Sequence, residues 1–257
     1  MEKKLAKSFV NKMPEINIQL FTPQSLYKYN HKGEKIPGFD SLTEAQQDSA
    51  LYTNSRYIRY IDDSIYLDKY INSLIDELRA LGFKVYLDNS TDSFLRQKPQ
   101  SYVLNLAQVQ LDEYLYPLED EEPYSDSIYY RVFYLNALDA SSWFELNKLN
   151  AAKPVKTVLY SSFTSTDGFK GRFYVDPFTM NPQYKYNIDS LTVKDAYDLA
   201  GFLGKKHASY LYDFFLNQYI LYHLPEDVEM EDYYHFNRFR HTVSPTEDDR
   251  FEILDNK

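Results

Sequence analysis

The residues that could do chemistry in this sequence are histidines, serines and carboxylates, and the first two lie outside known catalytic motifs. The five histidines form no HExxH zinc pattern, and His235 and His241 are six positions apart, on different faces of a helix. The serine pairs at 141–142 and 161–162 lie outside a GxSxG nucleophile elbow, and no glycine-rich phosphate-binding motif occurs. Cysteine is absent, which excludes thiolate zinc sites and cysteine nucleophiles. We therefore expect no catalytic residue of these classes, no metal ligands and no cofactor.

Carboxylates are plentiful, and a pair of them can hydrolyse a glycosidic bond when they flank it at the right separation. Asp112 and Glu113, in a predicted strand, are the best candidates among the 38 acidic residues, although a solvated strand end is the simpler interpretation. The acidic segment 118–127 could suggest calcium, but it lacks the alternating ligands and central glycine of a calcium loop. We predict an exposed acidic turn there.

Aromatic residues are unusually frequent, with 26 tyrosines and 17 phenylalanines. Two groups of ring side chains could stack on sugar rings or fill the pockets of a protein partner. Local packing that holds a loop and a tail against the body is the alternative. These candidate ligand-binding or partner-binding residues are Tyr27, Tyr29 and His31 in an early loop, and Tyr233, Tyr234 and Phe236 near the C-terminus.

The composition argues against nucleic acid as a partner and against a membrane span. With 38 acidic and 28 basic residues, the net charge is −10, which repels phosphate backbones and anionic lipid headgroups. No apolar run approaches the ~20 residues needed to cross a bilayer, and the first ten residues lack the apolar centre of a signal peptide. A membrane contact would therefore need a lipid anchor that is absent from this chain.

The first half of the chain predicts strands around one amphipathic helix. Alternation predicts a strand at 16–20, which Pro23 ends, and the segment 24–40 is typical of a long surface loop. A helix capped by Asp62 or Asp63 ends at Gly82. The segment 102–115 alternates as a long strand whose phase slips near 107–108, which predicts a β-bulge. The apolar stripe of the helix is Leu67, Ile71, Leu74, Ile75, Leu78 and Leu81.

The second half predicts strands, a hairpin and a longer helix. The segment 128–138 is strand-like, and the Asp-Gly pair at 167–168 between two alternating runs indicates a β-hairpin tip. Thr192 and Asp195 predict the start of a helix. The aromatic tail around 233–241 is predicted to be a short docking helix. Small residues that would let the long helix approach a neighbour closely are Ala196, Ala200, Gly204 and Ala208.

These elements predict an α/β to α+β fold with enough hydrophobic residues, 44% of 257, to build a core. A mixed sheet is flanked by the helices near 64–81 and 193–222, with a β-hairpin near 155–175. We expect a single domain over 1–257. The alternative division separates an α/β core at 1–116 from a part at 117–257 that holds the hairpin, the long helix and the tail.

The succession of INIQLFTP, a helix, LRALGFKVYL and SYVLNLAQVQLDEYL resembles the α/β core of bacterial envelope lipoproteins of the TolB amino-terminal, LpoB and CsgG type, over roughly Glu15 to Tyr116. The tyrosine- and asparagine-rich composition and the opening EKKLAKSFV also resemble the mature part of a Bacteroidetes-type envelope lipoprotein. The resemblance implies a non-enzymatic protein of the periplasm or outer membrane. It carries over no functional residue, because that group shares no catalytic motif.

Three functions remain open at this point, and the third is a cytoplasmic enzyme, which depends on a natural start at Met1. The first is a non-catalytic binding or assembly factor of the cell envelope, whose partner is another envelope protein. The second is a glycan-binding protein, or a glycoside hydrolase that uses aromatic residues and paired carboxylates. A periplasmic or outer-membrane location is expected, whereas a natural start at Met1 would indicate the cytoplasm.

Overall fold

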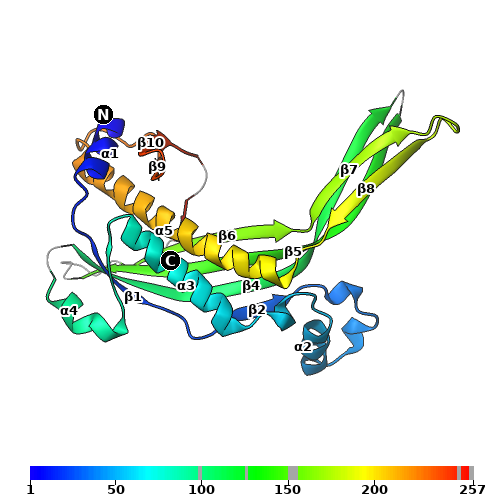
Figure 1. The fold of residues 1–257 in the computed structure, drawn as a ribbon, viewed down its shortest axis with the longest axis horizontal. Helices are drawn as coiled ribbons and strands as arrows, with labels where there is room; N and C mark the ends of the chain where they lie inside the picture. The colour runs from blue at the N-terminus through cyan, green and yellow to red at the C-terminus, as the bar shows by residue number, and fades with distance from the viewer. Residues whose placement is uncertain (98–99, 125–126, 150–155, 248–249, 255–257) are drawn as a thin grey trace.

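The computed structural model describes residues 1–97, 100–124, 127–149, 156–247 and 250–254, and its fold is a mixed sheet with two long helices on one face (Figure 1). The predicted α/β to α+β class is confirmed. The helices are α1 (Glu2–Asn11), α2 (Glu44–Thr53), α3 (Asp63–Ala80), α4 (Thr91–Leu95) and α5 (Val193–His223). The strands are β1 (Asn17–Phe21), β2 (Tyr27–Asn30), β3 (Lys84–Tyr86), β4 (Ser101–Tyr124), β5 (Ser127–Lys148), β6 (Lys156–Thr166), β7 (Gly168–Val175), β8 (Pro182–Asp189), β9 (Tyr234–Asn237), β10 (Thr242–Pro245) and β11 (Glu252–Leu254).

Helix α3 follows the predicted capping and periodicity. The carboxylate of Asp62 accepts a hydrogen bond from the Ile65 backbone N–H at 3.1 Å, and the chain leaves the helix through Gly82 at a φ of 98°. The buried side of the helix includes Leu67, Leu74 and other apolar residues. No helix in the described part of the chain combines the length and the apolar character that a membrane span requires.

Helix α5 packs closely against α3 along the predicted row of small residues. A Cβ atom built on Gly204 would lie 2.2 Å from the carbonyl oxygen of Tyr70, far inside van der Waals contact. Ala200 and Ala208, one turn to either side, are fully buried. The small side chains therefore set the distance between the two helices, as the spacing predicted.

The large sheet has seven strands in the order β11-β6-β5-β4-β1-β3, with β2 also paired to β4. Strands β1 and β2 pair in parallel with successive parts of β4, and the predicted bulge lies between those parts, at Leu106 and Gln108. The bulge resets the alternation, so that Leu104 and Val109 point to the same helix-covered face. The prediction of an uninterrupted loop at 24–40 is wrong for β2, because pairing with β4 orders that segment as a strand.

Strands β4 and β5 continue beyond the sheet and form, together with β7 and β8, a projecting arm (Figure 1). Cross-strand pairing extends β4 to Tyr124, so the predicted acidic turn at 118–127 is wrong for 118–124, and residues 125–126 lie outside the described residues. The β7–β8 hairpin packs on the β4–β5 hairpin through aromatic rings. The ring of Phe133 lies 4.8 Å from that of Phe169 and 4.9 Å from that of Tyr186.

The hairpin predicted near 155–175 would pair β6 with β7, but the observed hairpin is formed by the next two strands, β7 and β8. Strand β6 pairs with β5 and β11, whereas β7 pairs with β8 to make the observed hairpin. Asp167 lies between β6 and β7 and is buried, and its carboxylate accepts hydrogen bonds from the backbone of Asn136 and Leu191. The Asp-Gly pair therefore marks the point where the chain crosses from one sheet to another.

The predicted docking helix at 233–241 is also wrong, because this tail forms the β9–β10 hairpin. Two polar side chains of α5 hold its backbone. Asn217 both accepts from the N–H and donates to the carbonyl of Tyr234, at 2.8 Å each, and Asp213 accepts from the N–H of Phe236 at 2.8 Å. These side-chain bonds satisfy the extended backbone that a helix would have satisfied internally.

Candidate functional site

The face of the large sheet opposite α3 and α5 is the candidate functional site. Both long helices lie on one face (Figure 1), and the strand register identifies the side chains that point to the other. On the middle of β2, β4, β5 and β6, the polar and aromatic side chains of this face are exposed or half-buried, apart from Ser141. We call this set the open face: Tyr27, Tyr29, Gln108, Gln110, Asp112, Tyr114, Asp139, Ser141, Trp143, Tyr160, Ser162 and Thr164.

A row of hydrogen-bonded polar side chains runs along β4 on the open face. The amide of Gln108 donates to the side-chain oxygen of Gln110 at 2.8 Å, and the amide of Gln110 donates to Asp112 at 2.7 Å. The other oxygen of Asp112 lies 2.7 Å from Nε2 of His31. Each amide thereby fixes the orientation of the next polar group, so the row is arranged before any ligand binds.

A second polar group lies beside this row, on β5 and β6. Asp139 is the cross-strand neighbour of Asp112, and its two oxygens accept from Ser141 at 2.9 Å and from Thr164 at 2.7 Å. Opposed like charges on neighbouring strands repel. The hydrogen bonds that each carboxylate accepts offset this repulsion and hold both groups on one surface.

Aromatic rings flank the polar centre on both sides. Tyr27 and Tyr29 of β2 are 45% and 47% exposed. On the far side, the rings of Trp143 and Tyr160 lie 4.9 Å apart and are tilted by 46°. The open face therefore combines exposed rings on β2 and half-buried rings on β5 and β6 with amide and carboxylate groups of fixed orientation.

The predicted pairing of Asp112 with Glu113 is wrong, because neighbouring residues of a strand point to opposite faces. Glu113 is fully buried under the helices. Its carboxylate accepts from the ammonium group of Lys32 at 2.6 Å and from the backbone N–H groups of Arg56 and Tyr57 at 2.7 and 2.9 Å. Glu113 therefore anchors the 50–60 segment rather than facing a ligand.

The six predicted aromatic site residues fall into two separate places. Tyr27, Tyr29 and His31 lie on or at the rim of the open face. Tyr234 and Phe236 belong to β9 and are only 5% and 6% exposed, packed against α5, with the half-buried Tyr233 preceding them. The structure therefore does not bring the two groups together.

Two histidine-containing clusters, one fully buried and one half-buried, have structural roles. His207 is fully buried between α5, α3 and β5, and its Nδ1 is hydrogen-bonded to the hydroxyl of Tyr70, which also donates to Ser142. Burial, with a smaller contribution from the nearby charge of Lys206, lowers the pKa of His207 to about 3. His207 is therefore neutral near pH 7 and is shielded from any ligand.

The second cluster pairs His235 of β9 with Asp213 of α5, at 2.7 Å between Nδ1 and a carboxylate oxygen. Burial raises the pKa of Asp213, and the bonds from His235 and the Phe236 backbone oppose that shift. The pair holds the β9–β10 hairpin on α5. Among the described residues, no group of three or more histidine and acidic side chains is placed to hold a metal ion.

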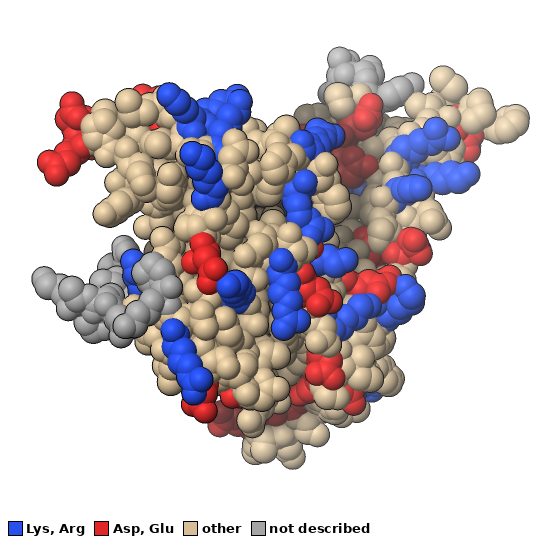
Figure 2. Space-filling model, turned by 60° about the vertical axis from the view of Figure 1, so that its left-hand side comes forward, with Lys and Arg blue, Asp and Glu red and all other residues tan. Residues whose placement is uncertain are grey.

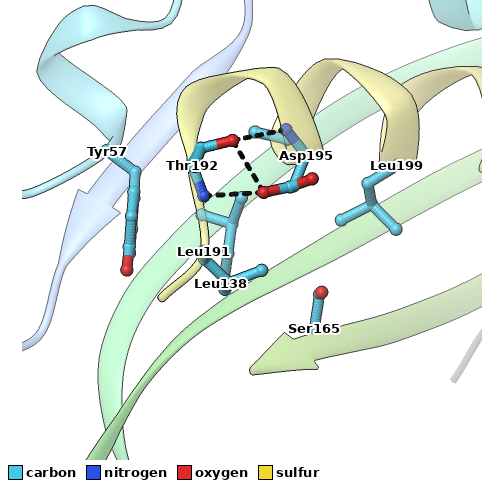
Figure 3. Close-up of a pocket in the computed structure, with 8 residues that line it drawn as sticks. Tyr57, Leu138, Ser165, Leu191, Thr192, Asp195 and Leu199 are labelled. Carbon is cyan, nitrogen blue, oxygen red and sulfur yellow. Dashed lines mark hydrogen bonds between the residues drawn. The ribbon is translucent and has the colours of Figure 1, made fainter. Parts of the chain in front are cut away.

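A cavity at the start of α5 is too small for a ligand (Figure 3). It has a volume of about 10 Å³ and is lined by Tyr57, Leu138 and residues of the first helical turn. Figure 3 shows the Thr192 and Asp195 side chains hydrogen-bonded across that turn, which is the predicted capping arrangement. A space of this size holds about one water molecule.

Comparison with known proteins adds no assignment to this geometry, since no protein-family model and no curated protein sequence matches the chain. Sequence reasoning missed most of the open face, including Asp139, Trp143 and Tyr160. Alternation along β4 and β5 separates the residues of the two faces. It does not tell which face the helices cover or which strands lie side by side.

Proposed function

We propose that this chain is a binding protein whose open face binds a glycan. The observation that carries the proposal is the placement of Tyr27 and Tyr29 on one side, and of Trp143 and Tyr160 on the other, of hydrogen-bonded amides and carboxylates. Aromatic faces suit the C–H surfaces of sugar rings, and oriented amide and carboxylate groups suit sugar hydroxyls.

A protein partner fits this surface less well than a glycan does. The buried centres of protein interfaces are depleted of aspartate and serine, whereas Asp112, Asp139 and Ser141 occupy the middle of the open face. From β2 to β6 the face spans three inter-strand distances, or roughly 14 Å, which is the scale of a short oligosaccharide.

The hydrogen bonds that Asp112 and Asp139 accept favour glycan binding over glycan cleavage. Asp112 and Asp139 each accept two side-chain hydrogen bonds on a sheet surface, and neither lines a described cavity. Glycoside hydrolysis needs one carboxyl group that is protonated and faces the leaving-group oxygen. Carboxylates that only accept hydrogen bonds are suited to holding hydroxyl groups.

A glycan array followed by calorimetric titration tests this proposal. For the best array ligand, we expect Tyr29→Ala and Trp143→Ala each to weaken binding about tenfold or more, equivalent to ~1.4 kcal/mol. Asp112→Asn should also weaken it, because the amide can no longer accept at both positions. Tyr52→Ala is the matched control, since Tyr52 is 54% exposed on α2 and is not one of the open-face residues. Absence of any glycan ligand, or equal affinity of all variants, would contradict the proposal.

Protein contact in the cell envelope is the second candidate function, and the projecting arm favours it. Phe178, in the turn of the β7–β8 hairpin, is 95% exposed, Met180 is 66% exposed, and Ile128 on the neighbouring hairpin is 70% exposed. Exposed apolar side chains gathered on one projection are typical of a protein contact. The envelope location rests on the resemblance to envelope lipoproteins and stays part of this proposal.

Crosslinking and pull-down from the native envelope fraction tests the second candidate. We expect a Phe178→Ser/Met180→Ser variant to lose a partner that the wild-type chain recovers. Phe239→Ser is the control, because Phe239 is 90% exposed but lies outside the arm. Recovery of the same partner by both variants, or fractionation of the native protein with the cytoplasm, would count against this function.

A further inference from the structure

A groove at the end of the molecule opposite the arm has the size and lining of a ligand site. It lies between the C-terminal half of α5, the end of α1 and the ends of β4, β5 and β6, and its volume is about 670 Å³. Ligand sites of proteins are commonly about 300–1,000 Å³. The groove opens on the helix-covered side of the sheet, so it is separate from the open face.

Aromatic side chains form the walls of the groove. Phe9 of α1 contacts Tyr219 of α5 with ring centroids 5.4 Å apart, and Tyr102 of β4 contacts Phe215 with centroids 4.8 Å apart. Each wall ring is therefore held by another ring rather than free to rotate. A preformed aromatic wall binds apolar ligands with little loss of side-chain entropy.

The charged side chains that line the groove in the described part of the chain are lysines. The ionisable lining of the groove consists of Lys12, Lys148, His223 and tyrosines, and no carboxylate lines it within the described residues. The ammonium group of Lys148 lies 5.9 Å from the centroid of the Tyr102 ring, at the mouth of the aromatic wall. Neither lysine forms an ion pair in the part of the chain that the structure describes.

This lining contrasts with the composition of the whole molecule. The chain carries a net charge of −10, so a large groove without a carboxylate departs from the rest of the surface. Figure 2 views the molecule with this end forward and shows lysine and arginine side chains over its middle, with aspartate and glutamate side chains among them. A local excess of basic groups attracts anions even to an acidic protein.

We propose that the groove binds a small amphipathic anion, with an apolar body against the aromatic walls and an anionic head beside Lys12 and Lys148. Medium-chain carboxylates and aromatic sulfonates belong to this class. Nδ1 of His223 donates a hydrogen bond to the Tyr219 carbonyl at 2.8 Å, which fixes the imidazole ring on the α5 side of the groove. The proposal is independent of glycan binding, which involves the other face.

Fluorescence titration with 8-anilinonaphthalene-1-sulfonate, followed by displacement, tests this site. We expect decanoate to displace the probe at concentrations at least tenfold lower than decylammonium does, because only the carboxylate can pair with the lysines. We expect a Lys12→Glu/Lys148→Glu variant to bind the probe at least tenfold more weakly. Lys7→Glu is the matched control, since it reverses an exposed charge on α1 outside the groove lining.

A groove-filling variant tests whether the probe occupies the groove itself, independently of the charge of its lysines. Thr157 of β6 lines the groove, and Thr157→Trp should abolish probe binding while the far-ultraviolet circular dichroism stays unchanged. Equal displacement by decanoate and decylammonium would overturn the proposal. Unchanged probe affinity in the charge-reversal variant or in the groove-filling variant would also overturn it.

Discussion

At the residue scale, the buried carboxylate of Asp167 is satisfied by hydrogen-bond donors on both of its oxygens. Asp167 accepts from the backbone and side-chain N–H groups of Asn136 at 2.9 and 2.8 Å, from the Leu191 N–H at 2.9 Å and from the hydroxyl of Tyr57 at 3.2 Å. Burial raises the pKa of Asp167, but these hydrogen bonds outweigh it and leave the pKa below its ordinary value. A charged acceptor is therefore built into the crossing between the two sheets.

Asp167→Asn should reduce the free energy of unfolding by about 2–4 kcal/mol. The amide nitrogen would face donors where the carboxylate oxygen accepts, so at least one buried donor loses its partner. Urea denaturation measures the difference. Asp189→Asn, at an exposed position of β8, is the control and should change stability by no more than about 0.5 kcal/mol.

The buried His207 predicts a pH dependence of stability. Its pKa is about 3 in the folded chain and 6.5 in the unfolded chain, so the unfolded state binds more protons between these values. Stability is therefore full above pH ~6.5 and falls as the pH decreases, by up to about 1.4 kcal/mol per pH unit for this group. Denaturation between pH 7 and 4.5 should show a shallower slope for His207→Phe than for the wild type, and equal slopes would contradict the assignment.

At the element scale, the distance between α3 and α5 depends on one glycine. The Cβ of an alanine at 204 would meet the backbone of α3 at the Tyr70 carbonyl and at the Leu74 nitrogen, 2.9 Å away, and backbone cannot move aside cheaply. At Gly201, three positions earlier, the nearest atom is the Cε of the flexible Lys69 side chain at 3.3 Å. The same substitution therefore has opposite consequences at the two positions.

Gly204→Ala should destabilise the fold by about 1–3 kcal/mol through overpacking. Gly201→Ala should be neutral or stabilising by up to ~1 kcal/mol, because alanine is the better helix former. Thermal unfolding of both variants beside the wild type provides the measurement. A Gly204→Ala variant as stable as Gly201→Ala would show that the helices do not approach as described.

At the scale of the whole molecule, one core joins the two halves of the chain. Its buried residues come from α1, β1 and α3 before position 116 and from β5, β6 and α5 after it. Strand β4 itself continues through position 116. A fragment ending there would lack both the neighbouring strand β5 and the helix that packs on α3.

We therefore predict that the chain unfolds as a single domain in one cooperative transition. Trp143, the only tryptophan, reports on β5, while far-ultraviolet circular dichroism reports mainly on the helices. The two signals should give the same urea midpoint. Separate midpoints, or an independently folded 1–116 fragment, would support the division into two parts instead.

The sequence by itself determined the local features of this protein: the caps and apolar stripe of α3, the small-residue row of α5 and the bulge in β4. Each depends on residues a few positions apart, whose spacing is fixed by helix and strand geometry. Only the tertiary structure decided that β7 pairs with β8, that the tail forms a hairpin on α5, and that Asp139 and Trp143 lie on the same open face as Tyr29. Strand pairing and the burial of one sheet face depend on contacts between segments that are distant in the sequence. The alternation of side chains along a strand separates its two faces, but it does not show which face the helices cover.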